Sequence, residues 1–333
     1  MTDLVFETAD RLFRDAVDKD LLDAAEAGTF PRELWRAVAE TGLVEAFADP
    51  ETGIADAGAV LRAAGRHAVP LPIAETLLAR RLLQRAGLDA PEGPLALAPA
   101  DPRDRAAFVE GRAMGTYYGV AWGGDAAALV LLADGEVLVA DPVRTRIEPG
   151  RSLAGEPRDT ITIDGPVLAH APAPTDVAGL RLEGAWARSL MMLGAMETVL
   201  DVAVTYANDR VQFGRPIGKQ QSIQHQLALM AEEVAASSVA ARLATERLDG
   251  PEAFLAVAAA KIRCGEAAGK AAEYAHQVMG AIGFTHEHTL HHFTRRLWTW
   301  RDEYGRESDW SIELGRYVAS VGADGLWPWL TRA

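Results

Sequence analysis

The sequence predicts a mainly α protein with a small β domain between two helical parts. Three observations indicate this order. Apolar residues recur every three or four positions over residues 1–92, short apolar runs punctuated by glycine and proline fill residues 93–174, and helical spacing returns over residues 175–333. We take these ranges as an N-terminal helical domain, a small β domain and a C-terminal four-helix bundle.

The N-terminal helices are predicted from amphipathic segments that carry start and stop signals. In PRELWRAVAETGLVEAF, Pro31 stands near a helix start, Leu34 and Val38 share a face, and Gly42 follows as a stop. Ordinary helix packing explains this region without a functional role.

The β domain is predicted from apolar runs that are too short for helices. In AAALVLLADGEVLVADP, two such runs flank the turn letters ADGE at 133–136, which predicts a hairpin. Further on, Ile161 and Ile163 alternate with polar residues, as in a strand with one buried face.

The C-terminal part is predicted as an antiparallel bundle of long helices. The first of these is apolar on most sides in its middle, which is typical of a buried helix. The helical patterns cover residues 185–210, 222–248, 251–281, 288–305 and 309–321.

Charge and composition exclude several classes of function. The 333 residues carry a formal net charge of −14, which argues against nucleic acid and anionic membrane surfaces because both require a basic face. Residues 1–20 lack the features of a secretory signal, and no apolar run of membrane length is expected. Cys264 is the only cysteine, so no internal disulfide can form, and a cytoplasmic location is expected.

An unusually polar turn separates the first two bundle helices. The segment YANDRVQFGRPIGKQQSIQHQ, from Tyr206 to Gln226, contains an arginine fork, flexible glycines and several glutamines. Turns between helices rarely need so much polar chemistry. On these residues alone, an ordinary helix hairpin with a salt-bridged Arg210 is the favoured interpretation.

The domain order, this turn and the later segment HQVMGAIGFTHEHTLHHFTRR together resemble the acyl-CoA dehydrogenase family. The likeness covers nearly the whole chain, and is strong over residues 180–300, fair over 30–90 and poor over the β domain. It implies an acyl-CoA dehydrogenase-like fold with FAD as the cofactor.

The resemblance also assigns a role to the turn, which would hold the adenosine and pyrophosphate end of FAD across a subunit interface. Arg210 would meet the pyrophosphate, Phe213 would pack on the nucleotide, and the glutamines would bond ribose or adenine. A second patch at 277–281 would contact the same nucleotide from a neighbouring chain. The residues expected to bind FAD are Arg210, Gln212, Phe213, Gln220, Gln221, Gln277, Val278, Met279, Gly280 and Ala281.

The implied reaction is α,β-dehydrogenation of an acyl-CoA thioester, in which a glutamate takes the α-proton. Two positions for that glutamate occur in the family. Counting without gaps places Tyr304 at one and Gly184 at the other, each next to a glutamate. A one-residue offset on a helix turns a side chain by roughly 100°. Glu183 and Glu303 are therefore the candidate bases, with Glu183 preferred because alignments drift at helix starts. The alternative is that both are solvated surface acids.

These departures resemble those of mixed bacterial assemblies, in which one subunit supplies the base and a degenerate homologous partner completes the nucleotide site. Such pairs are associated with bulky acyl-CoA substrates, including steroid side chains. The resemblance implies an acyl-CoA substrate, an electron-transfer flavoprotein or similar acceptor, and a homomeric or heteromeric assembly. A non-catalytic partner subunit is the alternative function.

Two histidine patterns have spacings that occur in metal sites. His288 and His292 stand at i and i+4, but a third ligand and outer-shell partners are not evident from the sequence. Glu273 and His276 form a single Glu-x-x-His, whereas a di-iron centre in a bundle requires two. We therefore expect no metal.

Overall fold

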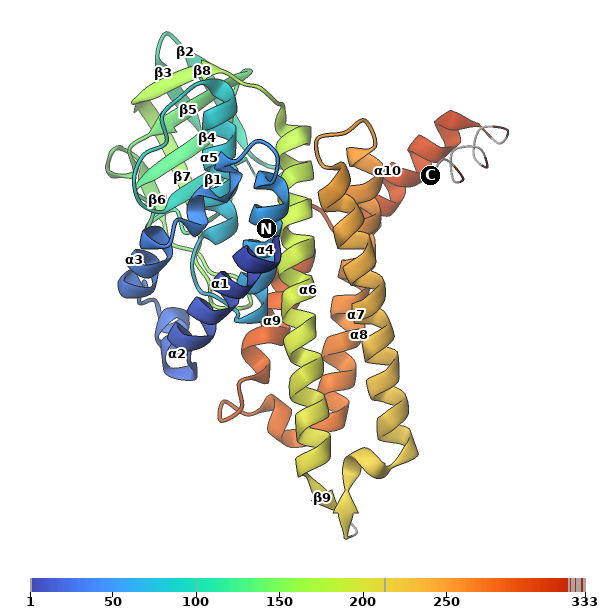
Figure 1. Cartoon of the computed structure of the whole chain (residues 1–333). Helices are drawn as coiled ribbons and strands as arrows, with labels where there is room; N and C mark the ends of the chain where they lie inside the picture. The colour runs from blue at the N-terminus through green and yellow to red at the C-terminus, as the bar shows by residue number, and fades with distance from the viewer. Residues whose placement is uncertain are drawn as a thin grey trace.

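A computed structural model describes residues 2–99, 101–212 and 214–322, together with residues 324, 327 and 331. A group of short helices and a β domain lie beside a bundle of long helices (Figure 1). The N-terminal helices are α1 (Thr2–Ala16), α2 (Lys19–Ala27), α3 (Arg32–Glu40), η1 (Leu43–Ala48), α4 (Gly53–Arg66) and α5 (Ile73–Ala86).

The β domain consists of two four-stranded sheets with the orders β1-β4-β5-β8 and β2-β3-β7-β6. Strand β1 pairs parallel to β4, whereas the other pairs within these two sheets are antiparallel. The strands are β1 (Leu95–Ala98), β2 (Arg105–Val109), β3 (Arg112–Ala121), β4 (Ala128–Ala133), β5 (Glu136–Ala140), β6 (Arg146–Glu148), β7 (Arg158–Pro166) and β8 (Ala169–Pro172), with the short helix η2 (Pro142–Arg144) before β6.

The predicted hairpin at 133–136 is confirmed. Ala133 pairs with Glu136, and the two turn residues Asp134 and Gly135 have φ values of 49° and 78°. Both are in the left-handed region that two-residue hairpin turns of this kind require.

The bundle is built around the 33-residue helix α6 (Val177–Asp209). It begins where the Asp176 side chain accepts a hydrogen bond from the Gly179 amide, an N-cap that the periodicity did not locate. The chain continues through a short hairpin, β9 (Val211–Gln212) and β10 (Arg215–Pro216), into η3 (Ile217–Lys219), α7 (Gln221–Arg247), α8 (Ala253–Met279), η4 (Gly280–Phe284), α9 (Leu290–Asp302) and α10 (Glu307–Val321).

Helix α6 packs on the N-terminal helices as well as within the bundle, which explains its apolar character. It approaches α4 so closely that a Cβ at Gly194 would fall 2.0 Å from the Arg62 carbonyl oxygen. By length and composition α6 could also cross a membrane, so the expectation that no apolar segment would reach that length is wrong. However, 56% of its most apolar window is buried inside the protein, and the core helix of a bundle passes the same test.

Candidate functional site

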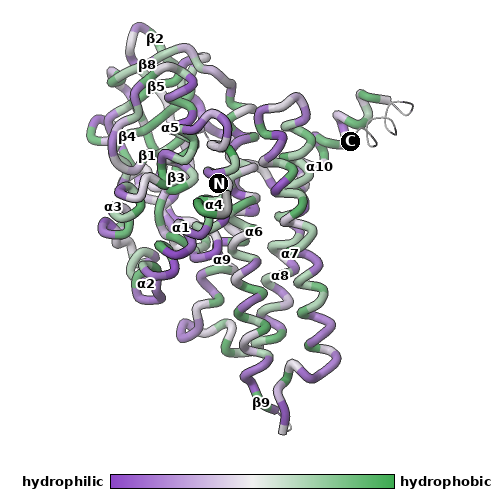
Figure 2. Tube along the Cα trace, in the orientation of Figure 1, coloured by the Kyte–Doolittle hydropathy of each residue, from purple (hydrophilic) through white to green (hydrophobic). Residues whose placement is uncertain are grey.

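The polar turn and the second predicted patch line one pocket of about 500 Å³ at the end of the bundle. Helices α6 and α8 run in the same direction, so both end here, and Figure 2 shows hydrophilic residues around the hairpin. We call this the turn pocket. It is lined by Tyr206, Arg210, Gln212, Ile217, Gln220, Ile223, Gln277, Val278, Met279, Gly280, Ala281 and Ile282.

The two segments expected to bind the nucleotide come together within one chain. The patch at 277–281 shares a pocket with Arg210 of the same chain, and its contact with a nucleotide from a neighbouring chain stays a prediction. The antiparallel bundle brings the two segments together because α7 returns the chain to the far end before α8 begins.

Arg210 ends α6 and is held there by its backbone. Its amide donates to the Tyr206 carbonyl at 2.9 Å, and its carbonyl accepts from the Ile217 amide at 2.8 Å, which closes the turn. Within the part of the chain that the structure describes, no hydrogen bond or ion pair engages the exposed guanidinium. The alternative of an ordinary helix hairpin with a salt-bridged Arg210 is therefore not supported among these residues. The guanidinium borders the turn pocket without an ion-pair partner.

Gly280 opens the other side of the turn pocket. It caps α8 with φ 65° and ψ −144°, and no heavy atom lies within 4 Å of where its Cβ would stand. The missing side chain therefore leaves room for a ligand to approach the backbone.

Not every predicted residue reaches this pocket. Gln221 begins α7, is exposed and does not line the turn pocket. Phe213 lies outside the described residues.

A second pocket, of about 320 Å³, lies between the β domain and the bundle. We call it the seam pocket. It contains several charged side chains, and Glu303 is one of them. Its lining residues are Glu75, Leu97, Asp101, Pro102, Tyr118, Gly119, Ala121, Arg158, Arg188, Asp302, Glu303, Tyr304, Gly305, Arg306 and Asp309.

Glu303 is held between two arginines. Its Oε1 accepts from Arg158 Nε and its Oε2 from Arg188 Nε, both at 2.6 Å. Burial would raise the pKa of this carboxyl, but the charges and hydrogen bonds of the two arginines outweigh it and hold the pKa at about 2. Such a carboxylate is a weak proton acceptor near neutral pH.

Tyr304, the next residue, also lies beside Arg188, whose Cζ is 5.8 Å from the centre of the tyrosine ring. Residue 303 is extended and Tyr304 has φ 56°, so the offset is not the helical one expected from the sequence. The tyrosine ring lies on Gly184 of α6, where a Cβ would come 2.3 Å from a ring carbon. The two positions assigned to the family's glutamate are thus in contact, and neither holds a carboxylate.

Glu183 is on α6, where the helical offset applies, and it pairs with two arginines of α5. Its Oε1 lies 2.9 Å from Arg85 Nη1 and 3.4 Å from Arg81 Nε. Burial raises the pKa of Glu183, although both arginines act to lower it. Glu183 does not line the seam pocket, and its contacts are those of an ion-paired structural residue.

Sequence reasoning missed the buried charges that surround Glu303. Arg188 pairs with Glu75, and both side chains are 3% exposed. Arg158 pairs with Glu156 as well as with Glu303. A signal was present, because Arg188 and Glu75 each interrupt a strongly apolar helical stretch and a charged residue is rarely buried there unpaired.

Comparison with known proteins supports the family resemblance seen in the sequence. Residues 182–301 match the acyl-CoA dehydrogenase C-terminal domain. The acyl-CoA dehydrogenase IpdE2 of Mycobacterium tuberculosis is 30% identical over 284 residues, which are 80% of this chain and 80% of that protein.

Two solved structures share the fold over nearly the whole chain. One chain of the ChsE4-ChsE5 complex from Mycobacterium tuberculosis superimposes with a TM-score of 0.86, at 21% identity, over 97% of this chain and 98% of that chain. The Tcur3481-Tcur3483 steroid ACAD G363A variant superimposes with a TM-score of 0.87, at 22% identity and the same coverage. These likenesses confirm the predicted fold class.

Proposed function

The chain belongs to the acyl-CoA dehydrogenase family of oxidoreductases that act on CH–CH groups, and we propose that it works as one subunit of an oligomeric, FAD-dependent enzyme. In this proposal it binds part of the FAD in the turn pocket and shapes the acyl site. A homologous chain supplies the general base.

The unpaired guanidinium of Arg210 is the observation that carries this proposal. A charge without a partner beside a pocket lined by glutamine amides is the arrangement that receives a pyrophosphate.

The turn pocket also fits the remainder of a dinucleotide. Gln212, Gln220 and Gln277 offer donors and acceptors for ribose and adenine, and the backbone at Gly280 is open to close approach. When bound, FAD supplies the hydride acceptor of the dehydrogenation. The residues of this chain would hold its nucleotide end in a fixed position and transfer no proton there.

The contacts around Glu303 and Glu183 support a general base that is supplied by another chain. Both carboxylates are held by arginine pairs, and the family positions are Gly184 and Tyr304. The likeness to the ChsE4-ChsE5 complex and to the Tcur3481-Tcur3483 pair supports a heteromeric assembly. The Tcur3481-Tcur3483 pair is a steroid ACAD, which supports a bulky acyl-CoA substrate. We propose a cytoplasmic location and an electron-transfer flavoprotein or similar acceptor.

Co-expression with a homologous chain encoded by a neighbouring gene tests the proposal. The purified assembly is assayed for FAD by its flavin absorbance and for acyl-CoA-dependent dye reduction. Arg210→Ala is expected to weaken FAD binding at least tenfold, because it removes the charge that meets the pyrophosphate. Arg215→Ala is the matched control, since Arg215 is an exposed arginine in the same hairpin that does not line the turn pocket. Equal FAD affinity in the two variants would contradict the role of the turn pocket.

A second candidate is an enzyme that uses its own Glu303, because this carboxylate does border the seam pocket. Glu303→Gln and Glu183→Gln in the assembly separate the two functions. If a partner supplies the base, turnover per bound FAD survives both changes within a few-fold. If one variant keeps its FAD and loses turnover a thousandfold or more, the base belongs to this chain.

A further inference from the structure

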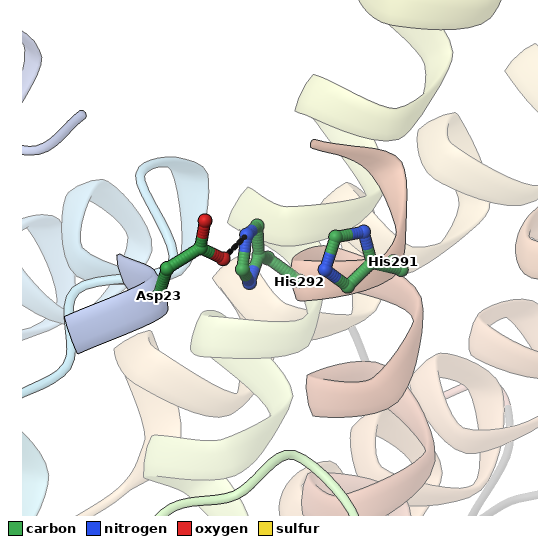
Figure 3. Close-up of side chains that lie close together, drawn as sticks. All are labelled: Asp23, His291 and His292. Carbon is green, nitrogen blue, oxygen red and sulfur yellow. Dashed lines mark ion pairs between the residues drawn. The ribbon is translucent and has the colours of Figure 1, made fainter. Parts of the chain in front are cut away.

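A cluster of two histidines and an aspartate joins α2 to α9, away from both pockets. Asp23 comes from α2, and His291 and His292 begin α9. One ligand atom from each of the three lies within 4.8 Å of the others. In Figure 3, His292 lies between Asp23 and His291.

Hydrogen bonds assign the tautomers of both histidines. Nδ1 of His291 lies 2.7 Å from the His288 carbonyl oxygen, and Nδ1 of His292 lies 2.7 Å from Glu26 Oε1. Each Nδ1 must therefore carry a hydrogen, because both partners are acceptors. In the neutral rings this leaves Nε2 of both histidines with a lone pair to offer.

These Nε2 atoms are buried and have no hydrogen-bond partner among the described residues. The His292 side chain is fully buried and His291 is 8% exposed. Nε2 of His292 lies 3.2 Å from Asp23 Oδ1. In the neutral ring, the lone pair on Nε2 would repel the carboxylate oxygen unless a cation lay between the two atoms. A buried acceptor without a donor is costly, so the cluster lacks a positively charged ligand or a proton.

The surrounding groups hold the three donors in place. Lys19 contacts Asp23 through Oδ2, which leaves Oδ1 toward His292. The charge of Glu26 is balanced by Arg295 and Arg296, which approach it from α9. Each donor therefore has an outer contact on the atom that does not face the cluster, which is the arrangement of metal-bound histidines and carboxylates.

We propose that Asp23, His291 and His292 bind one divalent cation of the zinc type. Two imidazole nitrogens and one carboxylate oxygen are zinc ligands, and the partly exposed face of Asp23 admits water as a fourth. Tetrahedral zinc with ligands about 2.0 Å away places its donors about 3.3 Å apart. The three donor atoms, which lie within 4.8 Å of one another, would draw closer when the ion binds. The ion would clamp α2 of the N-terminal domain to α9 of the bundle.

This proposal differs from the sequence-based expectation of no metal. The i, i+4 pair was the wrong pair to consider, because His288 Nδ1 accepts from the Leu290 amide at 3.0 Å. The missing third ligand, Asp23, lies far away in the sequence and is brought near only by the packing of α2 on α9.

Titration of zinc into the tag-free protein, after treatment with EDTA, tests the site by calorimetry. We expect one zinc per chain and a melting temperature that rises with zinc. Cobalt in its place should give the visible absorption of a tetrahedral site. Asp23→Asn and His291→Gln should each weaken zinc binding at least tenfold and remove the thermal shift. Asp23 is a suitable probe because its side chain is 42% exposed, so its replacement should leave the chain folded, as checked by circular dichroism.

His286→Ala is the matched control. This exposed histidine lies 5.2 Å from the His291 ring, between centroids, and is not among the proposed ligands. It should leave zinc affinity within twofold. Absence of saturable zinc binding would overturn the proposal. So would an Asp23→Asn variant that melts earlier by the same amount in EDTA and in zinc, which would make Asp23 and His292 an ordinary ion pair.

Discussion

The ring of Tyr304 lies directly on Gly184, and a Cβ at residue 184 would come 2.3 Å from a ring carbon. Tyr304 is 6% exposed, and its carbonyl accepts from Trp310 Nε1 at 3.0 Å, so the ring has little freedom to move away. Of the two positions at which a family glutamate is expected, one therefore holds Tyr304. The other holds Gly184, which leaves room for the tyrosine ring.

Gly184→Ala should destabilise the protein by about 1–3 kcal/mol, because the added methyl group overpacks a closed site. Urea denaturation followed by circular dichroism measures the change. Gly315→Ala is the matched control in α10, where no heavy atom lies within 4 Å of the added carbon. That change should stabilise the helix by roughly 0.5–1 kcal/mol. A neutral Gly184→Ala would show that the Tyr304 ring yields easily.

Glu303→Gln should destabilise the folded protein by about 3 kcal/mol, because it leaves buried arginine charge without its partner. The effect should depend on pH. The folded-state pKa of Glu303 is about 2, below the ordinary 4.5, so its stabilisation is present above about pH 5 and is lost as pH falls toward 2. Urea midpoints measured from pH 7 to pH 3 should fall more steeply for the parent than for Glu303→Gln. Glu232→Gln, at an exposed site on α7, should follow the parent curve.

Gly280→Ala should cost about 1–3 kcal/mol of stability, because φ 65° with ψ −144° is a conformation that residues with a Cβ rarely adopt. It should also lower FAD affinity in the assembly, since Gly280 lines the turn pocket and the methyl group adds bulk there. Gly269→Ala, within the same helix and without a positive φ, should be neutral or stabilising. Thermal melting and flavin content are measured for both variants. Equal behaviour of the two would contradict this reading of Gly280.

Lys261→Met should destabilise the C-terminal helices by about 1–3 kcal/mol, because two carbonyls would lose a buried donor. Lys261 Nζ donates to the carbonyls of Arg301 and Gly305 at 2.6 and 2.8 Å. Burial lowers the pKa of Lys261 to about 8. Between about pH 8 and 10.4 the unfolded chain then binds more protons, so this lysine makes stability rise with pH.

The stability of the Lys261→Met variant should lack this rise with pH. Cys264 acts in the opposite direction, since burial raises the pKa of its thiol to about 12. Comparing urea midpoints of the parent and the variant at each pH cancels that contribution. If the urea midpoints of the parent and of Lys261→Met changed in parallel from pH 7.5 to 10, the lowered pKa of Lys261 would be contradicted.

Much of the fold follows from local patterns in the chain. The hairpin at Asp134 and Gly135 was predictable because two short apolar runs and a left-handed turn are encoded within neighbouring residues. The bundle helices followed from apolar periodicity for the same reason, whereas the N-cap at Asp176 escaped because the periodicity begins only later. The turn at 206–226 was identified from its composition, but its pocket required the far end of α8.

By itself, the sequence determined the order of helical and β segments and the polar chemistry of the turn, because both depend on residues close together in the chain. Only the tertiary structure decided which charges pair. Glu303 meets Arg158 and Arg188, which lie 145 and 115 positions away, and Asp23 meets His292 across a still larger interval. Whether a carboxylate is a free base, an ion-pair partner or a metal ligand depends on the charges within a few ångströms of it, and packing alone brings those together.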